Sequence, residues 1–263
     1  MILSKSKEKR IEIFNQLSDY FNANHLDWLN SHPAQIYSAK TKSSFTPLKH
    51  NQLKINFNQE YSLDSILNLK GKTAVLIFGS QKNPGGGVTR GTVAQEEDIS
   101  LCTSWYFQAK QLTEYYNLRN KFDAINSDEI IFAPGLLIKD PINQNYLLSP
   151  KEIYFIAGAA PNFTGLVDSI GLEKAVKRLK EVENKILLRI EKVLSCAEEN
   201  QINNLILGAW GCGVFGLDAG MVANAFYQAI NKNLFNGNIV FAIPDQKINV
   251  FIDKFKNKQL IKP

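Results

Sequence analysis

The 263-residue sequence has little cysteine and histidine, and it lacks the motifs in which these residues usually act. Its three cysteines, Cys102, Cys196 and Cys212, are odd in number and form no CxxC pair. This argues against a disulfide framework and a common zinc site, and it favours a reducing compartment. All three histidines fall within residues 23–60 without the spacing of metal ligands, so they are expected on the surface or in loops. We therefore expect no metal centre and no cofactor.

Long hydrophobic runs are also missing. No apolar run approaches the roughly 18 residues of a membrane span, and the basic start of the chain is not followed by the apolar stretch of a signal peptide. We therefore expect a soluble, cytoplasmic protein, with export by another route left open. The net charge of +5 is spread evenly, which favours an anionic ligand but not specific nucleic-acid binding. The 44% hydrophobic content is sufficient for a sizeable core.

The hydrophobic pattern changes near residue 62. Residues 5–22 have apolar positions at helical spacing, and residues 23–60 are irregular and rich in polar residues. Strand and helix patterns then alternate. We predict a helical and irregular extension over residues 1–62, packed on one α/β domain over residues 63–263, with a mixed sheet between helices.

The expected strands are continuously apolar, and polar or glycine residues follow most of them. Because ligands of α/β sheets bind beyond the C-terminal strand ends, loops that follow the strands are the candidate sites. The expected strands are Ala74–Phe78, Ile130–Ala133 with an extension over Leu136–Ile138, Ile153–Ala157, Leu205–Leu207 and Ile239–Ile243, and the clearest helices are Leu172–Glu199, Asp218–Asn231 and Gln246–Lys256.

A glycine loop follows the first expected strand and begins at Asn83. The consecutive glycines Gly85, Gly86 and Gly87, followed by Val88, allow positive φ angles and a close approach of a ligand to backbone N–H groups, typically a phosphate. The spacing Thr92-x-x-Gln95 fits a capping box, which predicts a helix that begins at Thr92.

Two adjacent acids, Glu96 and Glu97, follow this loop. A carboxylate pair beside a phosphate loop indicates glycosidic-bond chemistry on a phosphorylated sugar, whereas the simpler alternative is that the acids only complement the helix dipole. Neighbours in a helix point about 100° apart, so the two acids need different roles. The preceding Gln95 can act as an orienting amide. A general acid at a helix N-terminus needs burial or like charge to raise its pKa.

A second glycine loop follows Leu205–Leu207 and includes Gly211, Cys212, Gly213, Val214 and Phe215. It matches GxGxxG, but it lies late in the chain and lacks the acidic residue expected about 20 positions later, so a dinucleotide-dependent oxidoreductase is the weaker alternative. Neither glycine loop ends in Gly-Lys-Ser/Thr, which argues against a P-loop nucleotidase.

The side chains of this second loop admit more than one role. Phe215 can face a ligand or pack in the core. For Cys212 a packing role is favoured over a nucleophilic one, because no histidine lies near it in sequence. Asn162, in the turn after the strand Ile153–Ala157, is either a turn residue or a ligand contact.

Together these motifs resemble the GGG…QEE signature of the poly(ADP-ribose) glycohydrolases, more closely their short microbial type, which is built on a macrodomain. The resemblance continues through the segment from Ala159 to Asn162 and the segment from Leu207 to Gly216, and it covers most of the chain. One departure is Arg90, which stands in the spacer before the signature where smaller residues are expected.

The resemblance implies that ADP-ribose lies across the strand ends, with Glu97 as catalytic acid and Glu96 at the ribose hydroxyls. It also implies that the two glycine loops hold the diphosphate and that Phe215 packs on the distal ribose. The partner would be an ADP-ribose polymer or an ADP-ribosylated protein, and a monomer is expected. Two alternatives stay open: removal of single ADP-ribose units, for example from arginine, and binding of ADP-ribose without cleavage. The substrate-binding residues predicted in this way are Asn83, Gly85, Gly86, Gly87, Val88, Gln95, Asn162, Gly211, Cys212, Gly213, Val214 and Phe215.

Overall fold

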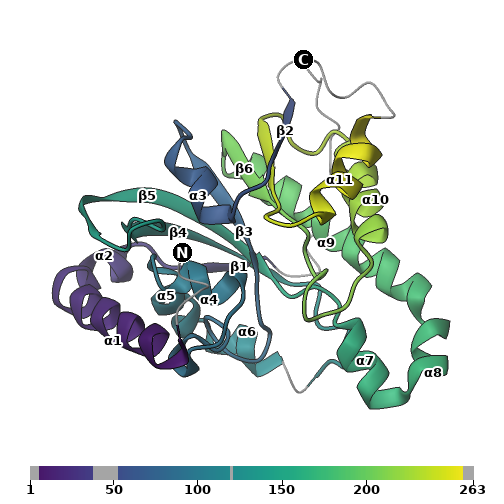
Figure 1. Cartoon of the computed structure of the whole chain (residues 1–263), viewed down its shortest axis with the longest axis horizontal. Helices are drawn as coiled ribbons and strands as arrows, with labels where there is room; N and C mark the ends of the chain where they lie inside the picture. Colours follow the sequence, from purple (N-terminus) through teal and green to yellow (C-terminus); the bar gives the residue numbers. More distant parts are fainter. Residues whose placement is uncertain (1–5, 38–52, 119–120, 257–263) are drawn as a thin grey trace.

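The computed structural model describes residues 6–37, 53–118 and 121–256 (Figure 1). Within these residues seven strands form one sheet in the order β1-β4-β5-β3-β6-β7-β2. Neighbours from β5 to β2 are parallel, and β4 is antiparallel to both β5 and β1. The strands are β1 (Gln35–Tyr37), β2 (Lys54–Asn58), β3 (Thr73–Phe78), β4 (Ile130–Lys139), β5 (Tyr146–Gly158), β6 (Asn204–Leu207) and β7 (Asn238–Ala242).

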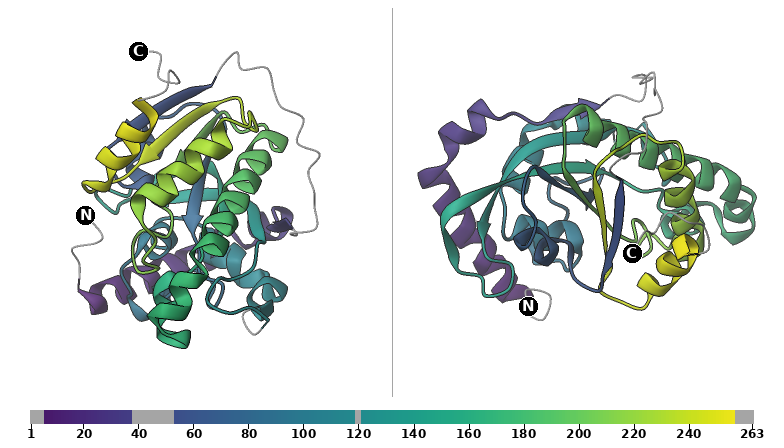
Figure 2. Two further views of the ribbon diagram at one scale, coloured as in Figure 1. Left: turned by 90° about the vertical axis from the view of Figure 1, so that its right-hand side faces the viewer. Right: turned by 90° about the horizontal axis from the view of Figure 1, so that it is seen from above.

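Helices cover both faces of this sheet (Figure 2). The fold therefore confirms the mixed sheet between helices. The helices are α1 (Lys7–Asn24), α2 (Leu26–Ser31), α3 (Ser62–Leu67), α4 (Gln95–Ser100), α5 (Trp105–Gln111), α6 (Thr113–Asn117), α7 (Phe163–Ile170), α8 (Leu172–Lys177), α9 (Leu179–Glu199), α10 (Ala219–Ile230) and α11 (Lys247–Lys256), with a 3-10 turn η2 (Val88–Arg90).

The central strand β3 shows how the two layers form. Successive side chains of a strand point to opposite faces. Ala74 and Leu76 pack with α9, α10 and α11, whereas Val75 and Ile77 pack with α1, α3, α4 and α5. Burial of each large apolar side chain stabilises the fold by roughly 1.5–3 kcal/mol. This explains why the strand is continuously apolar.

Both edges of the sheet come from the N-terminal segment that the sequence marks as irregular. The three-residue strand β1 pairs with β4, and the five-residue strand β2 pairs with β7. Strands this short give too little alternation to stand out in a polar sequence. The division at residue 62 stays a prediction, although β1 and β2 make this segment part of the sheet.

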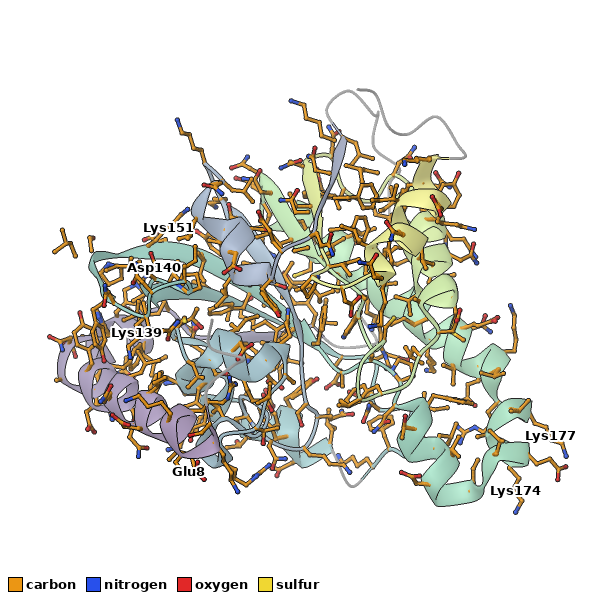
Figure 3. All side chains as sticks on the ribbon, viewed as in Figure 1. Glu8, Lys139, Asp140, Lys151, Lys174 and Lys177 are labelled. Carbon is orange, nitrogen blue, oxygen red and sulfur yellow. The ribbon has the colours of Figure 1, made fainter. Side chains whose placement is uncertain are left out.

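The predicted helix over Leu172–Glu199 is interrupted, and this part of the prediction is wrong. It forms α8 and α9, with a break at Arg178, whose guanidinium pairs with Asp123 and Glu181. The preceding helix α7 was not predicted, and it ends where Gly171 turns the chain with φ +81°. Figure 3 shows Lys174 and Lys177 of α8 pointing into solvent.

The loops that follow β3, β5, β6 and β7 emerge at one edge of the sheet, because these strands are parallel. From β3, the next parallel strands in the sequence lie on opposite sides, β5 on one and β6 on the other. Pairing of β3 with β6 ends at Val75 and Ile206. Pairing of β3 with β5 continues to Phe78. The strands therefore separate at the position where α/β folds bind ligands. None of the helices in the described part of the chain has both the length and the apolar content to cross a bilayer.

Candidate active site

The first glycine loop follows β3 and owes its shape to residues without a Cβ. Gly85 and Gly86 have φ angles of +63° and +64°, in the left-handed region. The loop closes on itself through hydrogen bonds from Gly86 N to Asn83 O at 3.0 Å and from Val88 N to Gly85 O at 3.3 Å. Val88 is buried in the core, so only its backbone can face a ligand.

Glu96 is buried, and protein donors contact both of its carboxylate oxygens. Oε2 accepts a hydrogen bond from Ser80 N at 2.7 Å, and Oε1 accepts one from Trp105 Nε1 at 3.1 Å. Burial raises the pKa of Glu96 to about 8, although these N–H donors lower it, and the charge of Glu97 raises it further.

Glu97 is buried beside the same loop, with its two oxygens in different surroundings. Oε1 accepts a hydrogen bond of 2.7 Å from Gly87 N. No hydrogen bond from a described residue reaches Oε2. A Cβ placed on Gly86 would lie 2.5 Å from Glu97 Oε1 and 3.2 Å from Glu96 Oε2. The loop can therefore approach both carboxylates only because position 86 is glycine.

Gln95 connects α4 to β3 and occupies the space where β3 and β6 separate. Its Oε1 accepts from Phe78 N at 2.9 Å, and its Nε2 donates to Leu76 O at 2.8 Å. The amide thus takes the place of a neighbouring strand. Substrate binding by Gln95 stays a prediction, but both ends of the amide are engaged within the fold.

The capping box predicted at Thr92 is wrong. Helix α4 begins at Gln95, its N-cap is Ala94, and no side chain caps it. The Gln95 amide cannot complete the box because it binds β3. Thr92 instead packs on the glycine loop, where its Oγ1 occupies the space that a Cβ on Gly87 would need.

The second glycine loop links β6 to α10 and lies against α7. Gly211 has a φ of +81°, and its carbonyl accepts a hydrogen bond of 3.0 Å from Leu217 N. Phe215 is half-buried, and its carbonyl accepts from Thr164 N at 3.2 Å. Gly213 and Val214 are exposed, and a Cβ on Gly213 would meet no heavy atom within 4 Å. Gly213 and Val214 are therefore accessible to a ligand, while the hydrogen bonds of Gly211 and Phe215 hold the loop in place.

Asn162 and Cys212 have structural roles at this edge. Asn162 caps α7, because its Oδ1 accepts from Gly165 N at 2.8 Å. Burial raises the pKa of the Cys212 thiol to about 12, which favours packing over a nucleophilic role. Ligand contacts by either residue stay predictions.

A cavity of about 390 Å³ opens between the ends of β3, β6 and β7. The second glycine loop forms one wall, and Gln95 and Asp98 of α4 form part of another. Gly85–Gly87 and the two glutamates are not among the residues that line this cavity, although Gln95, Asp98 and Ile99 of the same helix are. The buried Trp210 also lines it, and its indole N–H has no acceptor among the described residues. Other lining residues are Phe78, Val214, Phe215 and Asp245.

The described residues contain no group of three or more His, Cys, Asp or Glu side chains that could hold a metal ion. His25 and His32 are half-buried near α2, while His50 lies outside the described residues. Ser80 and Trp105, which hold Glu96, were not predicted. No spacing in the sequence indicates that either residue reaches a carboxylate, because both contacts depend on the fold.

Comparison with known proteins identifies relatives of this chain. The family profile described as microbial-type PARG, catalytic domain, matches residues 5–139. No curated protein matches the chain.

Solved structures match over most of the chain. A poly(ADP-ribose) glycohydrolase from Thermomonospora curvata superposes with a TM-score of 0.82 at 22% identity, covering 94% of this chain and 100% of that chain. Its complex with the inhibitor ADP-HPD gives 0.79 at 23% identity over the same shares. The Deinococcus radiodurans enzyme in complex with ADP-ribose gives 0.76 at 25% identity, covering 85% of this chain and 94% of that chain.

Proposed function

The chain belongs to the family of microbial-type PARG catalytic domains, and we propose that it releases terminal ADP-ribose units from poly(ADP-ribose) with Glu97 as general acid and base. It is a hydrolase that acts on the glycosidic bond of ADP-ribose. The observation that carries the assignment of Glu97 is its asymmetric environment. Gly87 N orients Oε1, while Oε2 has no hydrogen-bond partner among the described residues.

In the proposed reaction Glu97 protonates the 2′-oxygen of the preceding unit as the bond to the terminal ribose breaks. Positive charge then develops on the ribose as an oxocarbenium-like species. The Glu97 carboxylate next removes a proton from the attacking water, which gives ADP-ribose and restores the acid. Glu96, held by Ser80 and Trp105, accepts hydrogen bonds from the ribose hydroxyls and fixes the sugar.

The rest of the substrate follows the edge of the sheet. We place the diphosphate between Gly85–Gly87 and Gly211–Phe215, because backbone N–H groups in glycine turns bind anions without a Cβ in the way. Phe215 packs on the distal ribose, and the adenosine half occupies the 390 Å³ cavity next to α4. A cavity of this volume and mixed lining is typical of sites for small ligands. The structure of the Deinococcus enzyme in complex with ADP-ribose supports ADP-ribose as the ligand.

We also propose that the protein acts as a monomer in the cytoplasm. The three cysteines are all unpaired in the structure, as in proteins of a reducing compartment. The expected partner is the polymer or the protein that carries it.

The experiment that tests this function offers the purified protein four substrates side by side: poly(ADP-ribose), and single ADP-ribose units linked to arginine, glutamate or serine. We expect free ADP-ribose from the polymer without release of free oligomers, because each cleavage removes one unit from the terminus and leaves a polymer shorter by one unit. Release from single-unit substrates alone would instead indicate a mono-ADP-ribosyl hydrolase. Intact substrates in all four reactions would leave only a binding module.

A further inference from the structure

Arg10 of α1 is fully buried although it carries a charge. It lies on the helix face that packs on the core, together with Ile13, Phe14 and Leu17. A guanidinium in such a place persists only where fixed partners hold it. Its partners therefore indicate what the N-terminal helix contributes to the molecule.

The partners of Arg10 belong to the segment that carries the catalytic residues. Its Nε donates a hydrogen bond of 3.1 Å to Thr92 O, in the spacer between the glycine loop and α4. Its Nη1 lies 2.7 Å from Asp98 Oδ1, and Asp98 follows Glu97 directly in α4. One side chain thus joins α1 to both ends of the segment from Thr92 to Asp98.

These contacts reach the carboxylate of Glu97 through the glycine loop as well. Thr92 N donates to Gly87 O at 3.2 Å, and Gly87 N donates to Glu97 Oε1 at 2.7 Å. Arg10 is therefore connected to Glu97 by two routes, one through Thr92 and Gly87 and one through Asp98. Together the two routes form a closed ring of contacts that includes the catalytic acid.

The backbone of α1 also rests on the spacer. Gly91 has a φ of +70°, and a Cβ there would lie 2.5 Å from Lys7 O. The first turn of α1, which Figure 3 marks with Glu8, is therefore in direct contact with the chain that precedes α4. This contact brings Arg10 within reach of Thr92 and Asp98.

We propose that Arg10 is a positioning residue for Glu97, so that the N-terminal helix forms part of the catalytic machinery. The inference rests on the proposed function, since it assigns Arg10 to the step in which Glu97 transfers a proton. Arg10 fixes the spacer and α4 relative to each other, and thereby fixes Glu97 Oε1 on Gly87 N.

Because Asp98 titrates, the effect of replacing Arg10 on activity should depend on pH. Its carboxylate faces Arg10 from α1, Glu97 on its own helix and Asp64 from α3. Burial raises the pKa of Asp98 to about 6, and Arg10 lowers it. Above this pH Asp98 is ionised and pairs with Arg10, whereas at pH 5.5 its carboxyl is largely neutral and the pair contributes less. The loss of activity is therefore greater at pH 8 than at pH 5.5.

The test replaces Arg10 with methionine, which keeps length but removes both contacts, and compares it with Lys9→Met. Lys9 is the preceding residue on the same helix, and its ammonium forms an exposed ion pair with Glu12. For Arg10→Met we expect kcat on poly(ADP-ribose) to fall about 100-fold, the loss typical of a misplaced catalytic group. The Kd for ADP-ribose should stay within about twofold. Lys9→Met should match the wild-type protein in both.

A purely structural role for Arg10 would lower the melting temperature but leave kcat unchanged below the transition, with no growth of the effect from pH 5.5 to pH 8. This result would overturn the proposal. If Arg10→Met does not fold, Arg10→Lys serves instead, because one ammonium keeps the charge but cannot reach both Thr92 O and Asp98. Its kcat should fall about tenfold, and unchanged kcat would again contradict the proposal.

The two hypotheses can fail separately. If the wild-type protein releases no ADP-ribose, the proposed function fails, and Arg10 is then judged from a crystal structure of Arg10→Met. The proposal requires that Glu97 Oε1 leaves Gly87 N in that structure, and retention of the 2.7 Å contact would overturn it. If the wild-type protein is active and Arg10→Met matches it, only the inference about Arg10 fails.

Discussion

At the scale of single residues, the two neighbouring glutamates of α4 differ in how the protein holds them. Both oxygens of Glu96 accept protein hydrogen bonds, whereas only Oε1 of Glu97 does so among the described contacts. Glu96 therefore has a fixed orientation, whereas Oε2 of Glu97 is available for the proposed proton transfer. The 100° step between helix neighbours predicts separate roles for them, and the structure gives them different hydrogen-bond partners.

The raised pKa of Glu96 predicts how stability depends on pH. In the folded protein its pKa is about 8, raised from 4.5, so between these values the native state holds a proton that the unfolded state has lost. Unfolding free energy then falls as pH rises through this window. We expect the free energy of unfolding, measured with denaturant, to decline less from pH 5 to pH 8 in Glu96→Gln than in the wild-type protein.

The exposed Glu173 of α8 provides the control for this measurement. In Glu173→Gln the free energy of unfolding should decline from pH 5 to pH 8 as much as in the wild-type protein. If the Glu96→Gln curve runs parallel to the wild-type curve across the window, the raised pKa is not a property of Glu96.

At the scale of elements, the first glycine loop depends on close contact with the catalytic side chains. Gly86→Ala would force φ +64° on an alanine and place its Cβ 2.5 Å from Glu97 Oε1. We expect a loss of about 1–2 kcal/mol in stability from the left-handed backbone. We also expect kcat to fall about 100-fold, because Glu97 must move. Chemical denaturation and initial rates on the polymer measure these two effects.

The matched substitution in the second loop should act differently. A Cβ on Gly213 meets no protein atom within 4 Å, so Gly213→Ala should keep the wild-type stability. If this loop holds the diphosphate through its backbone, the new methyl group will meet the ligand. We then expect affinity for ADP-ribose, measured by calorimetry, to fall about tenfold or more. Unchanged affinity would remove Gly213 from the site.

The hydrogen bonds of the Gln95 amide between α4 and β3 give a further prediction. Gln95→Ala leaves Phe78 N and Leu76 O without their partner, and each buried group left unpaired costs about 1–3 kcal/mol. Thermal unfolding should show a marked drop for this variant. Gln16→Ala, on the exposed face of α1, should change little. Equal effects of the two substitutions would show that Gln95 does not join these elements.

At the scale of the whole molecule, the sequence predicts the central strands well, because β3, β6 and β7 are continuously apolar and lie between helices. It does not reveal β1 or β2, which are short and gain stability only by pairing with β4 and β7. No glycine or proline marks the helix break at Arg178, where the guanidinium pairs with the distant Asp123, so local periodicity gives no sign of it.

The site was predictable to the extent that its groups are adjacent in sequence. The Gly85–Gly87 loop and the two glutamates lie within one short stretch, and the structure brings Gly86 against both carboxylates. Arg10, more than 80 positions before Glu97, could not be assigned from sequence. Its one signal is that a charged residue falls on the apolar stripe of the predicted helix, three and four positions before Ile13 and Phe14.

The central claim is that this fold holds Glu97 as the acid and base that releases ADP-ribose. The most direct measurement compares the wild-type protein with Glu97→Gln on poly(ADP-ribose), following free ADP-ribose by chromatography and its Kd by calorimetry. We predict a loss of at least about 1,000-fold in release, with Kd within about tenfold, because the amide fills the same space without transferring a proton. Normal turnover by Glu97→Gln would contradict the account.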